Sequence, residues 1–370
     1  CITNICSSRE LVALGLECAP DEVLEKISKA IRETKTPDVK EAEGYKEIEA
    51  SLEKLPILTH QPIDGGAYIS SAMAVANDEE YGRNLSFHRA MKLDNQHMVM
   101  RILDRHLMDY MKRGLKEFAY CNGVSVPVLL GAATSLGIEE DEMAVANALA
   151  DSTVIELAGH SIPQSEVVMI CEFTGEMHDE GPFVDLTQTP DIIRKQPVAR
   201  IKRIFIRDDS VFHALLPSGP EHKVLMGMPR EPTIFNSVNK VVECHDVFMS
   251  HGGGSWLHGA VSIKKKNEDD GRKAIEAPGL AKEDWWITNE IGKRLGLDWK
   301  YNNPKDIFEE MAKTMPSLNN ITWERLEKEN SVTYPCNSPT AKGEEVVFGD
   351  RFPIEGGKGK FVPAKVIAPD

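Results

Sequence analysis

Residues 172–185 read Glu-Phe-Thr-Gly-Glu-Met-His-Asp-Glu-Gly-Pro-Phe-Val-Asp, which places five carboxylates around one histidine, His178. The glycine–proline pair inside this stretch predicts a sharp turn. Such a turn would hold Glu180 and Asp185 at one mouth, while Phe183 anchors the loop in apolar surroundings. Two carboxylates in unlike environments can divide the duties of acid and base, because burial raises one pKa and a nearby cation lowers the other. The alternative is a solvated acidic loop, since acidic side chains are usually exposed.

The bulk composition bounds the class of protein. With 370 residues, the chain is long enough for two or three domains. A formal net charge of -15 argues against a general affinity for nucleic acid or anionic lipid. No apolar run approaches the roughly 20 residues of a membrane span, so none is expected. The first residue is Cys1 and not Met, so we expect the chain to be a piece of a longer reading frame.

The cysteines do not form a recognisable framework. They are odd in number, scattered, and without a C-x-x-C pair: Cys1, Cys6, Cys18, Cys121, Cys171, Cys244 and Cys336. This pattern predicts reduced thiols in a cytoplasmic protein, and it argues against a disulfide framework or a zinc site.

Up to residue 270 the chain alternates short strand patterns with helical ones. Apolar spacing and capping residues predict helices at 20–33, 104–114 and 139–150. Strands are predicted at 67–76, 84–93, 125–130, 153–157, 166–173, 201–206 and 211–215, and 1–19 reads as a short strand or loop. With Asp104 as N-cap, the middle helix holds His106 in its first turn, where a phosphate would find free backbone N–H groups. These patterns indicate an α+β protein with a barrel-like sheet.

Arg89 is unusual within the strand predicted at 84–93. Strict alternation places it on the apolar face, on the opposite side of the strand from Asn84. Because burying an unpaired arginine is costly, we expect an anion nearby. The alternative is an arginine on an edge strand, whose charged end reaches the solvent.

The chain changes character at the dense charge run 263–272. Beyond it, helices are predicted at 283–295, at 304–315 with Asn303 as N-cap, and after the capping residue Thr322. Glycine-rich hairpin segments are predicted at 346–367. We therefore expect a separate unit from about residue 271 to 370.

Several motifs occur in order before this seam. They are Tyr-Gly-Arg-Asn-Leu-Ser-Phe-His-Arg at 81–89, Asp-Arg-His at 104–106, Asp-Glu at 141–142, Ile-Pro and Ser-Glu at 162–166, Glu-Gly-Pro-Phe-Val-Asp at 180–185, and Glu-His at 221–222. Together they resemble the UbiD-type decarboxylases. These prenylated-flavin-dependent enzymes remove or add CO2 on aromatic and α,β-unsaturated acids. The resemblance covers about residues 1–270.

The resemblance implies an architecture and a site. It implies a split β-barrel flavin-binding domain at 58–270, preceded by a truncated α/β segment at 1–57. The residues that match the catalytic set of the family are Arg89, Glu180 and Asp185. Those that match the ligands of a divalent metal, Mn²⁺ or Mg²⁺, are Asn84, His106 and Glu142, and K⁺ is a further possible ion. The cofactor contacts that it implies are Ser86, Arg89, Arg105, His106 and Glu221.

The chemistry of these residues agrees with the implied roles. Amide oxygen, imidazole and carboxylate suit Mn²⁺ or Mg²⁺, with phosphate oxygens completing the shell. Arg89 would lower the pKa of one acid and leave the other to deliver the proton that replaces CO2. Because alternation separates Asn84 from Arg89, we predict a bulge or strand end between them. Val184 departs from the family pattern, which usually has glycine there.

The same resemblance implies partners. A flavin prenyltransferase would supply the prenylated FMN, and the intact family member would be a homo-oligomer. The substrate would be a small carboxylic acid. A hydroxybenzoate, a polyprenylated hydroxybenzoate and a small unsaturated aliphatic acid all remain open at this point.

The tail resembles a different family. Its motifs are Glu-Ala-Pro-Gly at 276–279, Ala-Lys-Glu-Asp-Trp-Trp-Ile at 281–287, Ile-Thr-Trp-Glu-Arg-Leu-Glu at 321–327 and Thr-Tyr-Pro-Cys at 333–336. They are similar to part of the catalytic subunit of molybdopterin-dependent formate dehydrogenases, so we expect a chimeric join near residue 270. The alternatives are a component of a molybdopterin oxidoreductase, which the missing Cys-rich cluster motif argues against, and an inactive scaffold.

Overall fold

The computed structural model describes residues 1–266, 284–315, 318–329 and 332–343. The chain divides into two compact units, Cys1–Ile275 and Glu276–Asp370. The seam predicted near residue 270 lies outside the described residues, and the boundary predicted at residue 57 stays a prediction. No helix among the described residues is long and apolar enough to cross a membrane.

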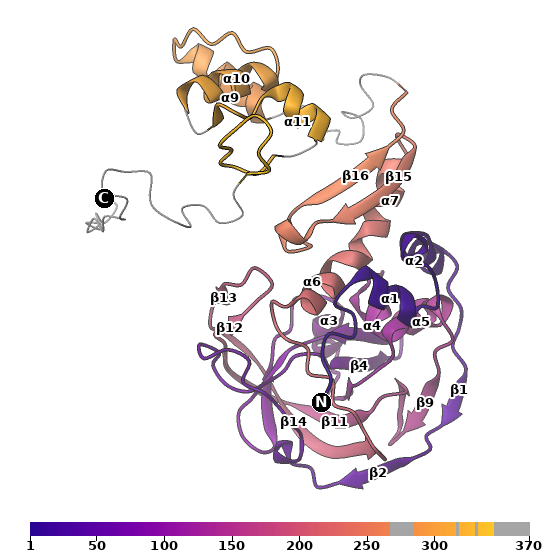
Figure 1. Ribbon diagram of the computed structural model, residues 1–370. Helices are drawn as coiled ribbons and strands as arrows, with labels where there is room; N and C mark the ends of the chain where they lie inside the picture. Colours follow the sequence, from indigo (N-terminus) through magenta and orange to yellow (C-terminus); the bar gives the residue numbers. More distant parts are fainter. Residues whose placement is uncertain (267–283, 316–317, 330–331, 344–370) are drawn as a thin grey trace, which may run out of the picture. The chain divides into compact units, whose positions relative to one another are not determined.

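The first unit is built on one large antiparallel sheet (Figure 1). Its order is β3 (Tyr68–Ile69), β6 (Ala90–Lys92), β7 (His97–Met100), β14 (Arg194–Arg207), β11 (Val167–Glu180), β8 (Glu117–Asn122), β4 (Met73–Asp78) and β5 (Gly82–Phe87), and β2 (Tyr45–Ile48) also pairs with β14. The hydrogen-bonded path among the described residues has two ends, β3 and β5, so the barrel-like sheet is not closed. The predicted α+β class is confirmed.

Both faces of the central strands are buried, and the period-2 pattern explains why. On β8, Ala119 and Cys121 belong to one apolar core, whereas Phe118 and Tyr120 belong to a second core on the other face. Successive side chains of a strand point to opposite faces, so a central strand with two apolar faces needs cover on both.

Helices cover one face of the sheet. Helices α1 (Arg9–Gly15), α2 (Val23–Arg32), α4 (Val126–Ala133) and α5 (Glu142–Leu149) lie together beside β4 (Figure 1) and contribute to the first core. The second core is formed by residues of β4, β7, β8, β11 and β14 together with α3 (His106–Lys112).

Shorter elements complete the described chain. In the first unit they are η1 (Pro20–Glu22), β1 (Val39–Glu41), η2 (Leu52–Lys54), β9 (Val154–Leu157), β10 (His160–Pro163), β12 (Phe183–Val184), β13 (Pro190–Asp191), α6 (Pro220–Gly227), η3 (Met228–Arg230), α7 (Glu231–Asn239), β15 (Cys244–Met249), η4 (His251–Gly253) and β16 (Gly259–Ile263). The second unit contains α9 (Asp284–Arg294), α10 (Pro304–Thr314) and α11 (Trp323–Glu329). All seven cysteines are free.

Most predicted helices and strands are confirmed, but the prediction of a strand at 125–130 was wrong. This segment forms α4, with Pro127 in the first turn. A short continuous apolar run cannot be assigned by periodicity alone. Close packing against α5 favours the helix, because a Cβ on Gly131 would lie 2.7 Å from the backbone oxygen of Glu142.

Four smaller predictions also need correction. Residues 1–19 contain helix α1, which the sequence reading missed, and the strand predicted at 67–76 is interrupted between β3 and β4. Residues 211–215 make only an isolated bridge, between His213 and Ile2. Asp104 does not cap α3, because its carboxylate pairs with Lys112 and Arg105 takes the N-cap position.

The helices predicted in the second unit are confirmed with their caps. The Asn303 side chain accepts from the backbone N–H of Asp306, and Thr322 Oγ1 accepts from that of Arg325. The hairpin segments predicted at 346–367 lie outside the described residues.

Candidate active site

The break between β5 and β6 places Arg89. Strand β5 ends at Phe87 and β6 begins at Ala90, so Arg89 lies in the connection and not on a continuous strand. The strand end predicted between Asn84 and Arg89 is therefore confirmed. Because Arg89 lies between two strands, the alternation of side chains along a strand does not fix the direction of its side chain.

The guanidinium of Arg89 joins the carboxylates predicted from the sequence. Its Nε and Nη2 donate to Glu180 Oε1 and Oε2 at 2.9 and 3.1 Å. Its Nη1 donates to Asp185 Oδ2 at 2.7 Å. The exposed fractions of the side chains are 11% for Arg89, 0% for Glu180 and 38% for Asp185. One carboxylate is thus enclosed and the other reaches solvent, as two different proton-transfer roles require.

Two aromatic side chains, Tyr68 and Phe183, pack against this cluster. The Tyr68 hydroxyl donates to Glu180 Oε1 at 3.0 Å, and Arg89 Cζ lies 4.2 Å from the centroid of the Phe183 ring. The rings of Tyr68 and Phe183 are 4.6 Å apart. The prediction that Phe183 anchors this loop in apolar surroundings is confirmed, since it is buried against Met91 and Val99 as well.

Sequence reasoning missed Asp191, a third carboxylate on Arg89. Arg89 Nη2 donates to Asp191 Oδ2 at 2.8 Å, and Arg194 binds both oxygens of Asp191 at 3.0 and 2.8 Å. Burial acts to raise the pKa of Asp191, but hydrogen bonds from Arg89 and from the Ile192 N–H outweigh it and lower that pKa. No motif marks Asp191. The pairing of β12 with β13 sets it opposite Phe183.

His222 belongs to the same region. Its Nδ1 accepts from the backbone N–H of Ser218 at 3.1 Å. Burial lowers the pKa of His222, the charge of Asp185 opposes this shift, and Arg89 adds to it. The ring therefore lies within electrostatic reach of both Arg89 and Asp185.

The rest of the acidic stretch is solvent-facing strand. Glu172 pairs with Arg200, Asp179 pairs with Lys195, and His178 is exposed on β11. For these residues the alternative of a solvated acidic surface is right, although it is a strand and not a loop.

A second cluster forms where α5 meets β5. Asn84 Nδ2 lies 3.2 Å from Glu142 Oε1, and Leu85 N–H donates to Glu142 Oε2 at 2.9 Å. Glu142 is 3% exposed, and burial raises its pKa to about 8. Arg83 binds Asp141, the N-cap of α5, and this pair holds the helix start against the strand.

The cluster contains residue types that bind divalent cations, a buried carboxylate and an asparagine. In this arrangement, however, Asn84 Nδ2 and Leu85 N–H both donate to Glu142, and the Asn84 oxygen accepts from Ser86. The Tyr110 hydroxyl is buried without a hydrogen-bond partner, and burial raises its pKa to about 12, with smaller contributions from the charges of Asp78 and Glu142. His106, the third predicted ligand, begins α3, which packs against β4 and β5. In the described part of the chain, no hydrogen bond joins His106 to the pair, and no group of three His, Cys, Asp or Glu side chains is arranged for a metal.

Three predicted cofactor contacts have different surroundings. Ser86 Oγ lies 3.0 Å from both Asn84 Oδ1 and His88 Nε2. Arg105 is exposed at the start of α3. Glu221 is fully buried, and its carboxylate accepts from the backbone N–H groups of Asn4 and Cys6 at 2.8 and 3.0 Å. Glu221 therefore anchors the N-terminal segment, and its contact with a cofactor stays a prediction.

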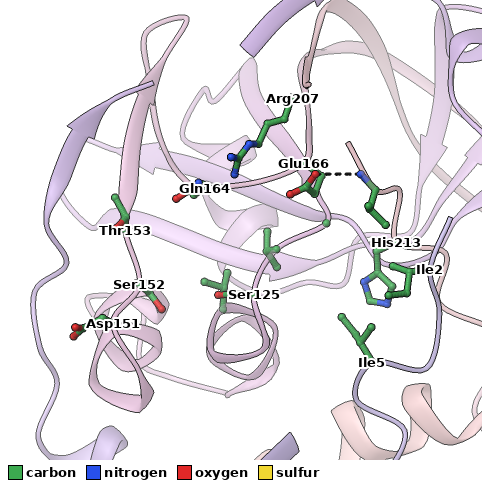
Figure 2. Close-up of a pocket in the computed structure, with 14 residues that line it drawn as sticks. Ile2, Ile5, Ser125, Asp151, Ser152, Thr153, Gln164, Glu166, Arg207 and His213 are labelled. Carbon is green, nitrogen blue, oxygen red and sulfur yellow. Dashed lines mark hydrogen bonds between the residues drawn. The ribbon is translucent and has the colours of Figure 1, made fainter. Parts of the chain in front are cut away.

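A cavity of about 490 Å³ lies elsewhere, near the start of β11 (Figure 2). Glu166, Gln164, Arg207 and His213 are among its lining residues. The Glu166 side chain accepts from Val211 N–H at 3.1 Å. None of the lining residues belongs to the Arg89 or Glu142 clusters. The cavity lies near the start of β11, whereas Glu180 is the last residue of that strand.

Comparison with known proteins now decides the family. Residues 31–220 match the family model described as UbiD: 3-octaprenyl-4-hydroxybenzoate carboxy-lyase Rift-related domain. The chain belongs to the UbiD family. Members of this family are carboxy-lyases, and the predicted resemblance of the first unit is confirmed.

Several curated proteins similar to this UbiD chain are named anhydromevalonate phosphate decarboxylase. The anhydromevalonate phosphate decarboxylase of Methanothermobacter thermautotrophicus is 39% identical over 293 residues, which are 75% of this chain and 68% of the relative. That of Methanocaldococcus jannaschii is 41% identical over 240 residues, 62% of this chain and 57% of the relative. Among solved structures, the UbiD-class enzyme HmfF from Pelotomaculum thermopropionicum in complex with prFMN is 27% identical with a TM-score of 0.70. The match covers 74% of this chain and 69% of that one.

Similarity to formate dehydrogenases is confined to short matches. The probable oxidoreductase YjgC of Bacillus subtilis is 38% identical over 97 residues, 26% of this chain and 10% of the relative. The F420-dependent formate dehydrogenase subunit alpha of Methanocaldococcus jannaschii is 36% identical over 96 residues, 25% of this chain and 14% of the relative. These matches show that a segment of the chain is similar to these proteins. They do not extend to an assignment of oxidoreductase activity.

Proposed function

We propose that this chain carries the site of a prenylated-FMN-dependent decarboxylase for a small α,β-unsaturated acid, with Arg89, Glu180 and Asp185 as its catalytic residues. The observation that carries the proposal is the single guanidinium that bridges one enclosed and one solvent-reaching carboxylate. Of the three substrate classes left open by the sequence, the unsaturated aliphatic acid is favoured by the similar relatives, which are named for anhydromevalonate phosphate.

The proposed division of labour follows from burial. Prenylated FMN would supply the electron sink for the carbon that loses CO2. The C–CO2 bond breaks, and a proton from the Glu180 carboxyl replaces the departing CO2 on that carbon. Arg89 stabilises the carboxylate that Glu180 becomes, through two hydrogen bonds of 2.9 and 3.1 Å. Asp185, at 38% exposure, exchanges protons with water and returns one to the enclosed site.

The proposed cation site lies beside the proposed cofactor site. Asn84, Glu142 and His106 would hold Mn²⁺ or Mg²⁺, whose charge would bind the flavin phosphate and offset that of the buried Glu142. Ser86 and Arg105 would contribute polar and cationic contacts to the same phosphate. A flavin prenyltransferase would supply the cofactor, and the intact protein would form a homo-oligomer.

The test is decarboxylation by the chain co-produced with a flavin prenyltransferase. Anhydromevalonate phosphate and 4-hydroxybenzoate are offered in parallel, and CO2 release is measured. We expect turnover of the first, and Glu180→Gln should retain the flavin spectrum while losing turnover by about 100-fold or more. The matched control is Glu172→Gln on the same strand, which should turn over like the parent. Normal turnover by Glu180→Gln would show the acid assignment to be wrong, and turnover of 4-hydroxybenzoate alone would overturn the substrate class.

A further inference from the structure

The two oxygens of the Glu180 carboxylate have different numbers of hydrogen-bond donors. Each oxygen of an ionised carboxylate has two lone pairs and can accept two hydrogen bonds. Glu180 Oε1 accepts two, from the Tyr68 hydroxyl at 3.0 Å and from Arg89 Nε at 2.9 Å. Glu180 Oε2 accepts one, from Arg89 Nη2 at 3.1 Å. No other side chain in the described part of the chain donates to this carboxylate, so one lone pair of Oε2 is left.

The remaining lone pair decides which oxygen carries the proton when Glu180 acts as an acid. A proton on Oε1 would break one of the two hydrogen bonds made there, whereas a proton on Oε2 breaks none. Glu180 is fully enclosed, so a donor that loses its acceptor there would be left unsatisfied at a high cost in free energy. The acidic hydrogen of Glu180 therefore belongs on Oε2.

Tyr68 is a hydrogen-bond donor in this arrangement and not a second acid. It is 1% exposed, and burial together with the charge of Glu180 raises the pKa of Tyr68 further above its usual range. The hydroxyl therefore keeps its hydrogen, which points to Glu180 Oε1. A donor of this kind stabilises the carboxylate that Glu180 becomes once its proton has left.

The backbone just before Tyr68 lies directly against the residues that follow Glu180. Gly65 N–H donates to the backbone oxygen of Pro182 at 2.8 Å. A Cβ on Gly65 would lie 2.3 Å from the backbone oxygen of Gly181, so only glycine allows this approach. The two segments are thus held together by their main chains.

The ring of Tyr68 is fixed as well. Strand β3 pairs with β6, which sets Tyr68 opposite Met91. The ring packs against that of Phe183, with 4.6 Å between the centroids. Asp64 Oδ1 accepts from the N–H of Val184 at 3.1 Å, the residue after Phe183. Backbone and ring contacts together therefore fix where the Tyr68 hydroxyl lies.

We propose that Tyr68 is a positioning residue for the acid: together with Arg89 Nε it fills the lone pairs of Glu180 Oε1, so that Glu180 carries its proton on Oε2. The inference rests on the decarboxylase site proposed above and adds the residue that sets how the proton is presented. In the proton-transfer step the O–H bond at Oε2 breaks, the proton replaces CO2 on the substrate carbon, and the electron pair stays on the carboxylate. Tyr68 and Arg89 stabilise that carboxylate through bonds already formed before the step.

The test removes the hydroxyl alone. Tyr68→Phe keeps the ring against Phe183 and leaves Glu180 Oε1 with one donor. The 370-residue chain, co-produced with a flavin prenyltransferase, is given anhydromevalonate phosphate, and kcat and KM are measured. Exchange of the product's new hydrogen in D2O is followed in parallel, because it reports the proton transfer even where another step limits turnover. We expect kcat and the exchange rate to fall by about 10-fold, and KM and flavin content to stay within about 2-fold of the parent.

A double variant separates an action through Glu180 from a general effect on the fold. In a Glu180→Gln background, Tyr68→Phe should lower the residual rates no further, because the acid on which Tyr68 acts is already absent. The matched control is Tyr45→Phe, which removes a hydroxyl that donates to the backbone oxygen of Ser165 at 2.5 Å. This control should leave kcat and exchange unchanged, and urea unfolding checks that each variant is folded.

The outcomes distinguish this inference from the proposed function. If the parent decarboxylates and Tyr68→Phe matches it in both kcat and exchange, the positioning role is wrong while the proposed function stands. A loss confined to KM or to flavin content, or a further loss of the same size in the Glu180→Gln background, would also overturn the positioning role. If the parent shows neither turnover nor exchange, the proposed function falls and this inference falls with it.

Discussion

Two buried glutamates, Glu180 beside Arg89 and Glu142 beside Asn84, are held in opposite ways. Glu180 is enclosed against a guanidinium that also binds Asp185 and Asp191. Glu142 is enclosed against neutral donors, and its pKa rises to about 8. Two equally buried carboxylates therefore have different surroundings, a guanidinium beside Glu180 and only neutral donors beside Glu142. The first cluster is the one for which we propose proton transfer, and the second is the one for which we propose cation binding.

Removing Arg89 is the strongest way to break the first cluster. Arg89→Met leaves the fully buried Glu180 without its cation, and breaking such a pair typically costs about 3–5 kcal/mol of unfolding free energy. We expect urea unfolding to show a loss of this size, and decarboxylation to disappear. Arg200→Met, which removes an exposed partner of Glu172, should change stability by less than about 1 kcal/mol. Similar losses in both variants would contradict the special role of Arg89.

Asp191 tests whether the third carboxylate positions Arg89. Asp191→Asn keeps the shape but weakens the charge-assisted bonds from Arg89 and Arg194, so kcat/KM should fall by about 10-fold. Asp191→Glu should recover part of it, since the charge returns. If only KM changed, or if neither constant changed, the role of Asp191 would be confined to the pairing of β12 with β13.

The neutral ring of His88 predicts a dependence of stability on pH. Burial lowers its pKa to about 4 in the folded chain, from near 6.5 in the unfolded chain, so the unfolded state binds more protons between these values. Its contribution is fully present above pH 6.5 and is lost as pH falls toward 4, with a slope of at most about 1.4 kcal/mol per pH unit. His88→Gln, which cannot titrate, should flatten this part of the stability curve measured by urea unfolding. An unchanged slope would mean that His88 keeps its ordinary pKa in the folded chain.

Glu142→Gln should have the smallest effect on stability. A neutral amide can keep most of the contacts with Asn84 and Leu85, so metal-free unfolding should change by less than about 1 kcal/mol. Mn²⁺ binding, in contrast, should be lost because one ligand charge is gone. If Glu142→Gln lowered the unfolding free energy by several kcal/mol, it would resemble Arg89→Met. The charge of Glu142 would then be needed for folding.

The sequence was most informative where chemistry is carried by short motifs. The place of Phe183, the strand end before Arg89 and the α+β class were all predicted and are confirmed. The predictions of secondary structure were wrong where the local pattern is ambiguous. The apolar run at 125–130 is a helix because α5 packs on it, and the helix at the N-terminus was missed altogether.

Long-range contacts explain the residues that sequence reasoning missed or misjudged. Asp191 joins Arg89 across 102 positions, and Glu221 binds Asn4 across 217. Neither spacing has a local signature, since each depends on which strands pair and which segments return to the same place.

By itself, the sequence determined which side chains can do chemistry: the motifs name the family, and one of them holds both Glu180 and Asp185. Only the tertiary structure decided what surrounds them. It enclosed Glu180 against Arg89 and left Asp185 in reach of water, added Asp191, and gave Glu142 neutral neighbours. The physical reason is that residue type sets a group's intrinsic pKa and donors, whereas burial and the charges that folding brings near it set its state.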